Sequence, residues 1–334
     1  MSQLIIPIFI THQGCPHRCS FCNQAPVTGT EELYSHALSA QEVVDEIATW
    51  LQRSKKNSIT QVAFYGGSFT GLPENRQIEL LEAVQPFINR GQVTSIRIST
   101  RPDYITDHTA IFLKRYNVDT VEIGVQSLNQ IVLDANFRGH TTRQVETALH
   151  ILKKGGFRVG AQLLLGLPGD STKSAIHSAK YLAKLGPHFA RLYPALVLKG
   201  SALESMYTNG QYRPLSLHKA IALCSRIKTV LEESNISVIR MGLQPSRALE
   251  ASVIAGPYHP ALGELVLSRA YFKTIRKTLT KNSSIRQINA SARDQSIILG
   301  QKKSSINRLN SLRLLDNVTF NFNDTIARGT IDFA

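Results

Sequence analysis

The stretch Gly14-Cys-Pro-His-Arg-Cys-Ser-Phe-Cys-Asn23 gathers three of the chain's four cysteines, Cys15, Cys19 and Cys22. It follows the apolar run Leu4–Ile10, which is typical of a β-strand. A C-x3-C-x2-C loop presents three thiolates to one centre. A cubane iron–sulfur cluster normally takes four cysteines, so three leave one iron open. Because an open metal position is where a substrate or cofactor binds, the spacing predicts a cluster that takes part in chemistry.

Zinc is the main alternative reading of the same loop. Structural zinc sites use four ligands in paired C-x2-C or Cys/His spacings. Cys19 and Cys22 form one such pair, and Cys15, His12 and His17 lie nearby. A disulfide among three close cysteines would leave one thiol over. The spacing alone therefore leaves a zinc knuckle open beside the iron–sulfur cluster.

The composition indicates an intracellular protein. With 334 residues and 43% hydrophobic content, the chain can form one large α/β domain with a small appendage. No apolar segment is long enough to span a bilayer, and the N-terminus lacks the basic and small-residue features of a signal peptide. Few, clustered cysteines favour a reducing compartment. We therefore expect a cytoplasmic protein without a membrane partner, with Cys224 packed in the core as a small hydrophobe.

Positive charge is concentrated at the C-terminal end. The net charge is +14, and residues 269–334 contain twelve Lys or Arg against four Asp, which gives +8. A basic segment of this kind can neutralise phosphates and attract nucleic acid. A generally basic, solvated surface explains the same count, so both interpretations stay open.

Strand-like runs alternate with helical patterns over the first 245 residues. The strands are expected at 4–10, 59–65, 95–99, 120–125, 158–164 and 189–196. Near-continuous apolar strands separated by single helices predict a parallel sheet with covered faces. Six such units are too few for a closed eight-stranded barrel. The sequence therefore predicts an α/β fold, a partial (β/α)6 barrel over residues 1–245.

The pattern changes after about residue 245. Pro257, Pro260 and several glycines interrupt it. Further elements are expected at 262–279 and 305–314 as helices, and at 284–289, 317–321 and 330–333 as strands. Residues 246–334 are thus predicted to form a small, basic α/β C-terminal domain.

Several polar and glycine residues stand where predicted strands end. In folds built of βα units, ligands bind at the carboxyl ends of the strands. The cysteine loop, Gly66-Gly67-Ser68, Arg101 and Gln126 all occupy such ends. We therefore expect these residues to surround a common ligand site, although Arg101 and Gln126 could instead serve only barrel-interior hydrogen bonding.

Two further residues are candidates for catalysis. Glu122 precedes Gln126 by four positions, so strand alternation points both side chains to one side. If that side is the barrel interior, Glu122 needs a partner such as Arg101 or Arg191. His140 is either an acid or base facing the substrate or a capping residue before the helix expected at Thr142.

The cysteine loop after the first strand of a partial barrel resembles the radical S-adenosylmethionine (radical SAM) enzymes. Phe21, just before the third cysteine, agrees with this family. The resemblance implies that the three cysteines hold a [4Fe–4S] cluster whose open iron binds S-adenosylmethionine. It implies that Gly66, Gly67 and Ser68 line the methionine end, with Arg101 and Gln126 as candidates for the carboxylate and ribose.

Four further motifs narrow the resemblance. They are Ser99-Thr-Arg-Pro-Asp-Tyr104, Val121-Glu-Ile-Gly-Val-Gln-Ser127, Arg138-Gly-His-Thr141 and Arg191-Leu-Tyr-Pro-Ala-Leu-Val197. In this order they resemble the radical SAM half of the catalytic subunit of Elongator, which modifies the wobble uridine of transfer RNA. Small bacterial radical SAM proteins share the same core. No acetyltransferase domain or Gly-rich acetyl-coenzyme A loop is visible, so a carboxymethyl-forming reaction is not expected.

The function implied by the resemblance is reductive cleavage of S-adenosylmethionine to a 5′-deoxyadenosyl radical. The implied substrate is transfer RNA or another RNA, bound through the basic C-terminal segment, and an electron donor is required. Two alternatives stay open: the same chemistry on a small molecule or peptide, and a non-enzymatic iron–sulfur or zinc-binding module.

Overall fold

The computed structural model describes residues 3–10, 13–16, 18–23, 38–54 and 59–334. They form two compact units. The first unit comprises residues 1–216 and 227–258, and the second comprises residues 217–226 and 259–334. The predicted boundary between residues 245 and 246 stays a prediction.

A seven-stranded parallel sheet organises the first unit. Its order is β1-β2-β3-β4-β5-β6-β8, and every neighbouring pair runs parallel. The strands are β1 (Gln3–Phe9), β2 (Ile59–Tyr65), β3 (Ser95–Thr100), β4 (Val118–Gln126), β5 (Arg158–Leu165), β6 (Phe189–Pro194) and β8 (Ser237–Met241). The sheet curls into a half-barrel, which confirms the predicted α/β partial barrel.

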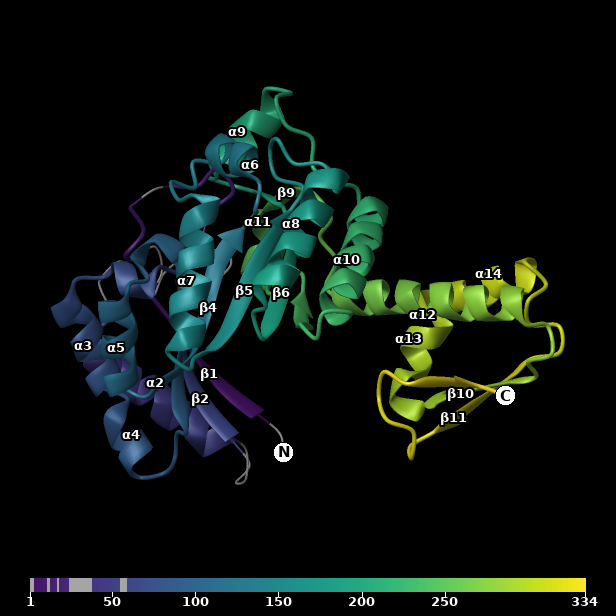
Figure 1. The fold of residues 1–334 in the computed structure, drawn as a ribbon, viewed down its shortest axis with the longest axis horizontal. Coiled ribbons are helices and arrows are strands. Elements are labelled where there is room, and N and C mark those ends of the chain that lie inside the picture. The colour runs from purple at the N-terminus through teal and green to yellow at the C-terminus, as the bar shows by residue number, and fades with distance from the viewer. Residues whose placement is uncertain (1–2, 11–12, 17, 24–37, 55–58) are drawn as a thin grey trace. The chain divides into compact units, whose positions relative to one another are not determined.

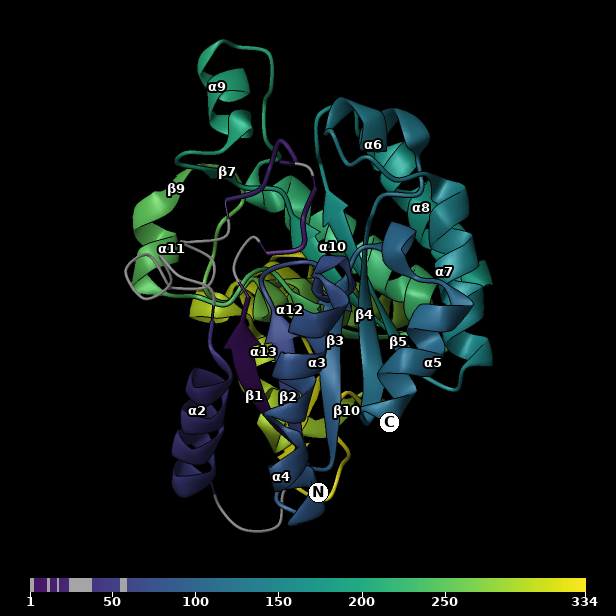
Figure 2. The ribbon, with the colours of Figure 1, turned by 90° about the vertical axis from the view of Figure 1, so that its left-hand side faces the viewer.

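Helices follow the strands along the chain. They are α2 (Ala40–Arg53), α3 (Glu74–Glu82), α4 (Gln85–Asn89), α5 (Asp107–Arg115), α6 (Gln130–Ala135), α7 (Thr142–Lys154), α8 (Thr172–Leu185), α9 (Ala202–Thr208), α10 (Leu217–Glu232) and α11 (Arg247–Ser252). Helices α3, α5, α7 and α8 lie side by side along one face of the sheet (Figures 1 and 2). Ser39 and Glu42 form a capping box at the start of α2.

The sheet has one strand more than expected from the sequence. The extra strand, β8, pairs with β6 at the edge of the sheet. Its sequence, Ser237-Val-Ile-Arg-Met241, is short, and every residue is at least partly exposed. An edge strand covered on fewer sides does not need the continuous apolar run that marks β2 or β4.

The core of the half-barrel lies along the central strands. All residues of β4 except Asp119 are buried. Val62, Phe64, Ile96 and Ile98 on the neighbouring strands are completely inaccessible to solvent. Close packing along these strands fixes the positions of the residues at their carboxyl ends.

The second unit is a small α/β module with its own core. It contains α12 (Leu262–Lys281), β10 (Gln287–Ser291), α13 (Gln295–Leu299), α14 (Ser304–Ser311), β11 (Thr319–Asn323) and β12 (Ile331–Phe333). Strand β10 lies in the middle, parallel to β11 and antiparallel to β12. Ile275, Ile288, Ile298 and Leu309 are buried together beneath the sheet. Of the twelve basic residues from 269 onward, all but Arg269 are exposed.

Over the described ranges, no helix combines the length and the apolar character needed to cross a membrane.

Candidate functional site

A cavity of about 710 Å³ opens at the carboxyl ends of the strands in the first unit. All three clustered cysteines line it. So do residues on or after β2, β3, β4, β6 and β8, namely Gly66, Gly67, Arg101, Gln126, Arg138, Arg191, Tyr193 and Arg240. The structure therefore brings the cysteine loop, most of the glycine motif and both predicted ligand-binding side chains to one site.

The first part of the cysteine loop packs directly on the turn after β2. Ser68 donates its backbone N–H to the Gln13 carbonyl at 3.0 Å. A Cβ on Gly67 would lie 2.5 Å from that same carbonyl oxygen, and one on Gly14 would lie 2.1 Å from the Ser68 oxygen. Only glycine permits so close an approach of two backbones. The two glycines thus position Cys15 relative to the sheet.

The second part of the loop is held by segments distant in sequence. The hydroxyl of Ser20 donates to the Asn136 side chain at 2.6 Å, and the Ser20 carbonyl accepts from the Leu203 N–H at 2.7 Å. The side chain of Asn23 donates to the Lys199 carbonyl at 2.6 Å. In Figure 2 this purple loop lies at the end of the sheet toward which the strand arrows point. Cys19 and Cys22 are therefore anchored to the elements that follow β4 and β6.

The three cysteines are not joined in a disulfide, and their surroundings suit an anionic cofactor. Burial raises the pKa of the Cys15 thiol, and the Arg138 guanidinium only partly opposes this effect. Cys19 is buried, and its sulfur accepts a hydrogen bond from Arg138 Nη1 at 3.3 Å. Iron or zinc must displace the thiol protons on binding. A guanidinium beside Cys19 favours the resulting negative charge.

Three cysteines that line one cavity match the thiolate ligands of a cubane cluster with one open iron. Among the residues that the structure describes, no three His, Cys, Asp or Glu side chains converge on one metal position. A cubane cluster binds each thiolate at a separate iron corner, so its ligands need not converge on one point. His12 and His17, which the zinc interpretation requires, lie outside the described residues.

Ser68 does not occupy the position predicted for it. Its side chain is fully buried and contacts the Thr100 hydroxyl at 3.0 Å, and its oxygen accepts from the Arg101 N–H at 3.2 Å. It is not part of the cavity wall, unlike Gly66 and Gly67. The hydroxyl instead ties the turn after β2 to the end of β3.

Arg101 and Gln126 each present an unpaired polar atom at the cavity. Arg101 is 2% exposed and binds Asp103 through two nitrogens at 3.0 and 2.8 Å, which leaves Nη1 without a partner. Gln126 ends β4 with φ +63°, and its Oε1 is buried and unpaired. Because buried polar atoms rarely stay unpaired, both side chains suit the binding of a polar ligand.

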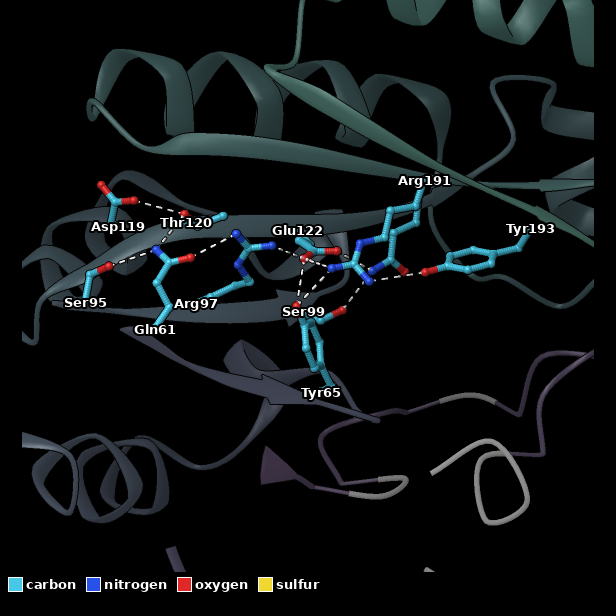
Figure 3. A network of polar contacts seen from close by, with 11 residues as sticks. Gln61, Tyr65, Ser95, Arg97, Ser99, Asp119, Thr120, Glu122, Arg191 and Tyr193 are labelled. Carbon is cyan, nitrogen blue, oxygen red and sulfur yellow. Dashed lines mark hydrogen bonds and ion pairs between the residues drawn. The ribbon is translucent and has the colours of Figure 1, made fainter. Parts of the chain in front are cut away.

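Glu122 lies below the cavity in a buried ion-pair network (Figure 3). Its carboxylate accepts from Arg97 at 3.0 Å and from Arg191 at 2.8 Å. The Tyr65 hydroxyl and the Gln162 amide also donate to it, at 3.0 and 3.1 Å. Arg191 is one of the two predicted partners, whereas Arg101 is not a partner. Fully buried and saturated with donors, Glu122 is suited to hold the arginines in place, and its role as a catalytic residue stays a prediction.

The network raises the pKa values of Tyr65 and Arg191. Burial, with the neighbouring Glu122 carboxylate, raises the pKa of Tyr65 to about 12. Burial disfavours the charge of Arg191, but the Glu122 carboxylate outweighs this effect and raises the pKa of Arg191. Both groups therefore keep their protons at neutral pH and act as hydrogen-bond donors on the cavity wall.

His140 stands apart from the cavity. It is 1% exposed, it is not among the lining residues, and neither ring nitrogen forms a hydrogen bond of normal geometry. Burial and the charges of Arg138 and Arg101 lower its pKa to about 3, so the ring is neutral. The cap of α7 is Thr141, paired with Gln144, so the capping interpretation of His140 is wrong. Its role as a catalytic candidate stays a prediction, one that the position outside the cavity does not favour.

Sequence reasoning missed four arginines of the site, and one of them, Arg18, lines the cavity from within the cysteine loop. Arg97 interrupts the apolar strand β3, and this charge in a buried strand was the available signal. Arg138 belongs to a motif that the sequence identified without a role for this residue. Arg240 lies on β8, the strand that the sequence did not reveal, as the direct neighbour of Arg191.

A curled parallel half-barrel with three cysteines around the cavity at its strand ends defines a class of cofactor-dependent α/β proteins. The family described as the radical SAM superfamily matches residues 9–182. A model for the radical SAM C-terminal domain matches residues 187–273. The chain belongs to the radical SAM superfamily. Enzymes of this family use a [4Fe–4S] cluster and S-adenosylmethionine, which confirms the predicted cofactors at the level of the family.

Three curated relatives extend the likeness. An uncharacterised protein of Methanocaldococcus jannaschii is 27% identical over 81% of this chain and 84% of its own length. The tRNA uridine(34) acetyltransferase of the same organism is 30% identical over 51% of this chain and 31% of its own. Elongator complex protein 3 of Saccharomyces cerevisiae is 25% identical over 67% of this chain and 47% of its own. The chain thus spans only a third to a half of the two relatives with stated functions.

A solved structure confirms the fold. The archaeal Elp3 of Methanocaldococcus infernus, with its N-terminus deleted, superimposes with a TM-score of 0.64 at 20% identity. The match covers 83% of this chain and 64% of that one. The predicted resemblance to the Elongator catalytic subunit is therefore confirmed.

Proposed function

We propose that this protein binds a [4Fe–4S] cluster through Cys15, Cys19 and Cys22 and cleaves S-adenosylmethionine reductively. The observation that carries the proposal is that all three cysteines, the glycines Gly66 and Gly67 and two unpaired polar side chains line one cavity. When bound and reduced, the cluster supplies the electron that splits S-adenosylmethionine into methionine and a 5′-deoxyadenosyl radical, which takes a hydrogen atom from the substrate.

Each group of residues has a task in this proposal. We assign the methionine carboxylate to Arg101, whose Nη1 is unpaired, and a hydroxyl or amine donor of the ligand to the unpaired Gln126 oxygen. Gly66 and Gly67 form the part of the cavity wall that we assign to the methionine end. The apolar wall from Phe21, Leu164 and Ala195 excludes water from the radical.

The charge of the cavity supports an anionic substrate. Among the described residues that line it, five are arginines and none is Asp or Glu. The arginines are Arg18, Arg101, Arg138, Arg191 and Arg240. Arg191 and Arg240 are direct partners across β6 and β8, and in the described part of the chain Arg240 has no carboxylate partner. Because adjacent like charges are unfavourable without an anion, this end of the cavity suits a phosphate-bearing substrate.

RNA is the substrate class that we propose, transfer RNA first. Two observations support it besides the cavity: the names of the curated relatives and the exposed basic residues of the second unit. We propose that this second unit binds the RNA backbone and that a separate one-electron donor reduces the cluster. Cytoplasmic location stays a prediction.

The substrate class is tested with reconstituted protein, dithionite and S-adenosylmethionine under anaerobic conditions. We compare 5′-deoxyadenosine formation after adding bulk tRNA, ribonuclease-digested tRNA, or a pool of small metabolites and peptides. The proposal predicts stimulation by intact tRNA that digestion abolishes. Stimulation only by the small-molecule pool would contradict RNA as the substrate and leave the radical chemistry intact.

A further inference from the structure

Arg138 is a buried cation that lacks an acidic partner. Its side chain is 6% exposed, with Nη1 donating to Cys19 Sγ at 3.3 Å and Nη2 donating to the Gly124 carbonyl at 2.8 Å. Its Nε has no partner, and within the described residues it forms no ion pair. A buried charge without a counter-ion is costly. An anion bound in the cavity, which Arg138 lines, would supply the missing negative charge.

Gly124 on β4 has no side chain, and this leaves space for the Arg138 guanidinium. A Cβ on Gly124 would lie 2.9 Å from Arg138 Nη2 and 3.0 Å from Gln126 Nε2. Gly124 has an ordinary φ, so the backbone conformation does not require glycine there. The physical reason for glycine at this position is the space that Arg138 occupies.

We propose that Arg138 is the counter-ion of the [4Fe–4S] cluster and sets its reduction potential through the hydrogen bond to Cys19. The inference rests on the proposed function, since it requires a cluster bound by the three cysteines. A cluster with three thiolates is an anion, and reduction adds another negative charge. A cation and an N–H donor at a ligand sulfur stabilise the reduced state more than the oxidised state, which raises the potential. Arg138 thus favours transfer of the electron from the donor into the cluster.

The test is a redox titration of the cluster followed by its electron paramagnetic resonance signal, without S-adenosylmethionine or substrate. We expect the midpoint potential to fall in Arg138→Gln and to fall less in Arg138→Lys, which keeps the charge but loses the two-pronged geometry. Arg143→Gln is the matched control, since Arg143 is exposed on α7 and the change removes the same charge. Its potential should equal that of the wild type.

A second variant keeps the test valid if Arg138→Gln fails to fold. Gly124→Ala leaves the charge in place but forces the guanidinium away from its present position. Its midpoint potential should also fall, with the cluster fully loaded. Loaded Arg138→Gln or Gly124→Ala protein with the wild-type potential would overturn the inference. Failure of the wild type itself to load a cluster would instead overturn the proposed function, and the inference with it.

Discussion

At the scale of single residues, we expect Glu122 to contribute more to the free energy of unfolding than the other residues of the site. It is fully buried and is the only carboxylate that pairs with Arg97 and Arg191 within the described residues (Figure 3). Glu122→Gln leaves two buried guanidinium groups without compensation. We expect the free energy of unfolding to fall by about 3–5 kcal/mol, measured by anaerobic urea denaturation.

The control for this change is an ion pair at the surface. Glu79, 45% exposed, pairs with Arg76 on α3. Glu79→Gln should cost less than about 1 kcal/mol, because water screens the pair. Equal losses in the two variants would mean that the network does not stabilise the half-barrel as the contacts imply.

The neutral state of His140 predicts a loss of stability in acid. The ordinary pKa of 6.5 applies to the unfolded chain, whereas the folded value is about 3. Between about pH 3 and pH 6.5, His140 is protonated in the unfolded chain and neutral in the folded protein. The contribution of His140 is therefore complete above pH 6.5 and is lost as pH falls toward 3, by about 1.4 kcal/mol per pH unit.

Urea unfolding at about pH 7.5 and about pH 5.5 measures this effect. His140→Gln should lose less stability between the two pH values than the wild type, by about 1 kcal/mol. His150→Gln, an exposed position on α7, should lose as much as the wild type. If the free energy of unfolding of His140→Gln falls between the two pH values as much as that of the wild type, the ring is not held neutral in the folded protein.

At the scale of elements, the contact between the cysteine loop and the turn after β2 determines whether a cluster can be held. Gly67→Ala would place a Cβ 2.6 Å from the Ile10 carbonyl as well as against Gln13. The loop must then shift while the sheet stays folded. We expect most of the iron to be lost after reconstitution, with the far-ultraviolet circular dichroism of the wild type retained.

Gly156→Ala is the control for the glycine change. Gly156 has φ +69°, and a Cβ added there would meet no atom within 4 Å, so alanine causes only backbone strain of about 1 kcal/mol. Its iron content should match the wild type. Full iron loading of Gly67→Ala would contradict the role of this contact.

The sequence predicted the elements whose physical signal is local. The six apolar strands depend on such local patterns, and the structure has a strand at each of the six expected places. Strand β8 was missed because an exposed edge strand carries a weak apolar signal. The sequence did not reveal that Arg97 pairs with Glu122 or that Arg138 donates to Cys19. These contacts join segments that are far apart along the chain, and no local sequence pattern encodes them.

At the scale of the whole molecule, the basic second unit predicts a salt-dependent affinity for RNA. Lys302, Lys303 and Arg308 are all exposed. Replacing the three with glutamine should weaken binding of bulk tRNA and reduce the slope of log affinity against log salt by up to about 3. Fluorescence anisotropy over a salt series measures both quantities.

The matched control removes the same charge from the first unit. Lys173, Lys180 and Lys184 are exposed on α8. Their triple glutamine variant should keep the salt slope of the wild type. Equal weakening in both triple variants would indicate general attraction by net charge rather than a binding surface on the second unit.

The central claim is that the three cysteines hold a cluster that cleaves S-adenosylmethionine. The most direct test reconstitutes the protein anaerobically with iron and sulfide, reduces it with dithionite, adds S-adenosylmethionine and quantifies 5′-deoxyadenosine beside a Cys19→Ala variant. The account predicts 5′-deoxyadenosine from the wild type and none above background from the variant. A fully loaded wild-type cluster that yields no 5′-deoxyadenosine would contradict it and favour a non-enzymatic iron–sulfur protein.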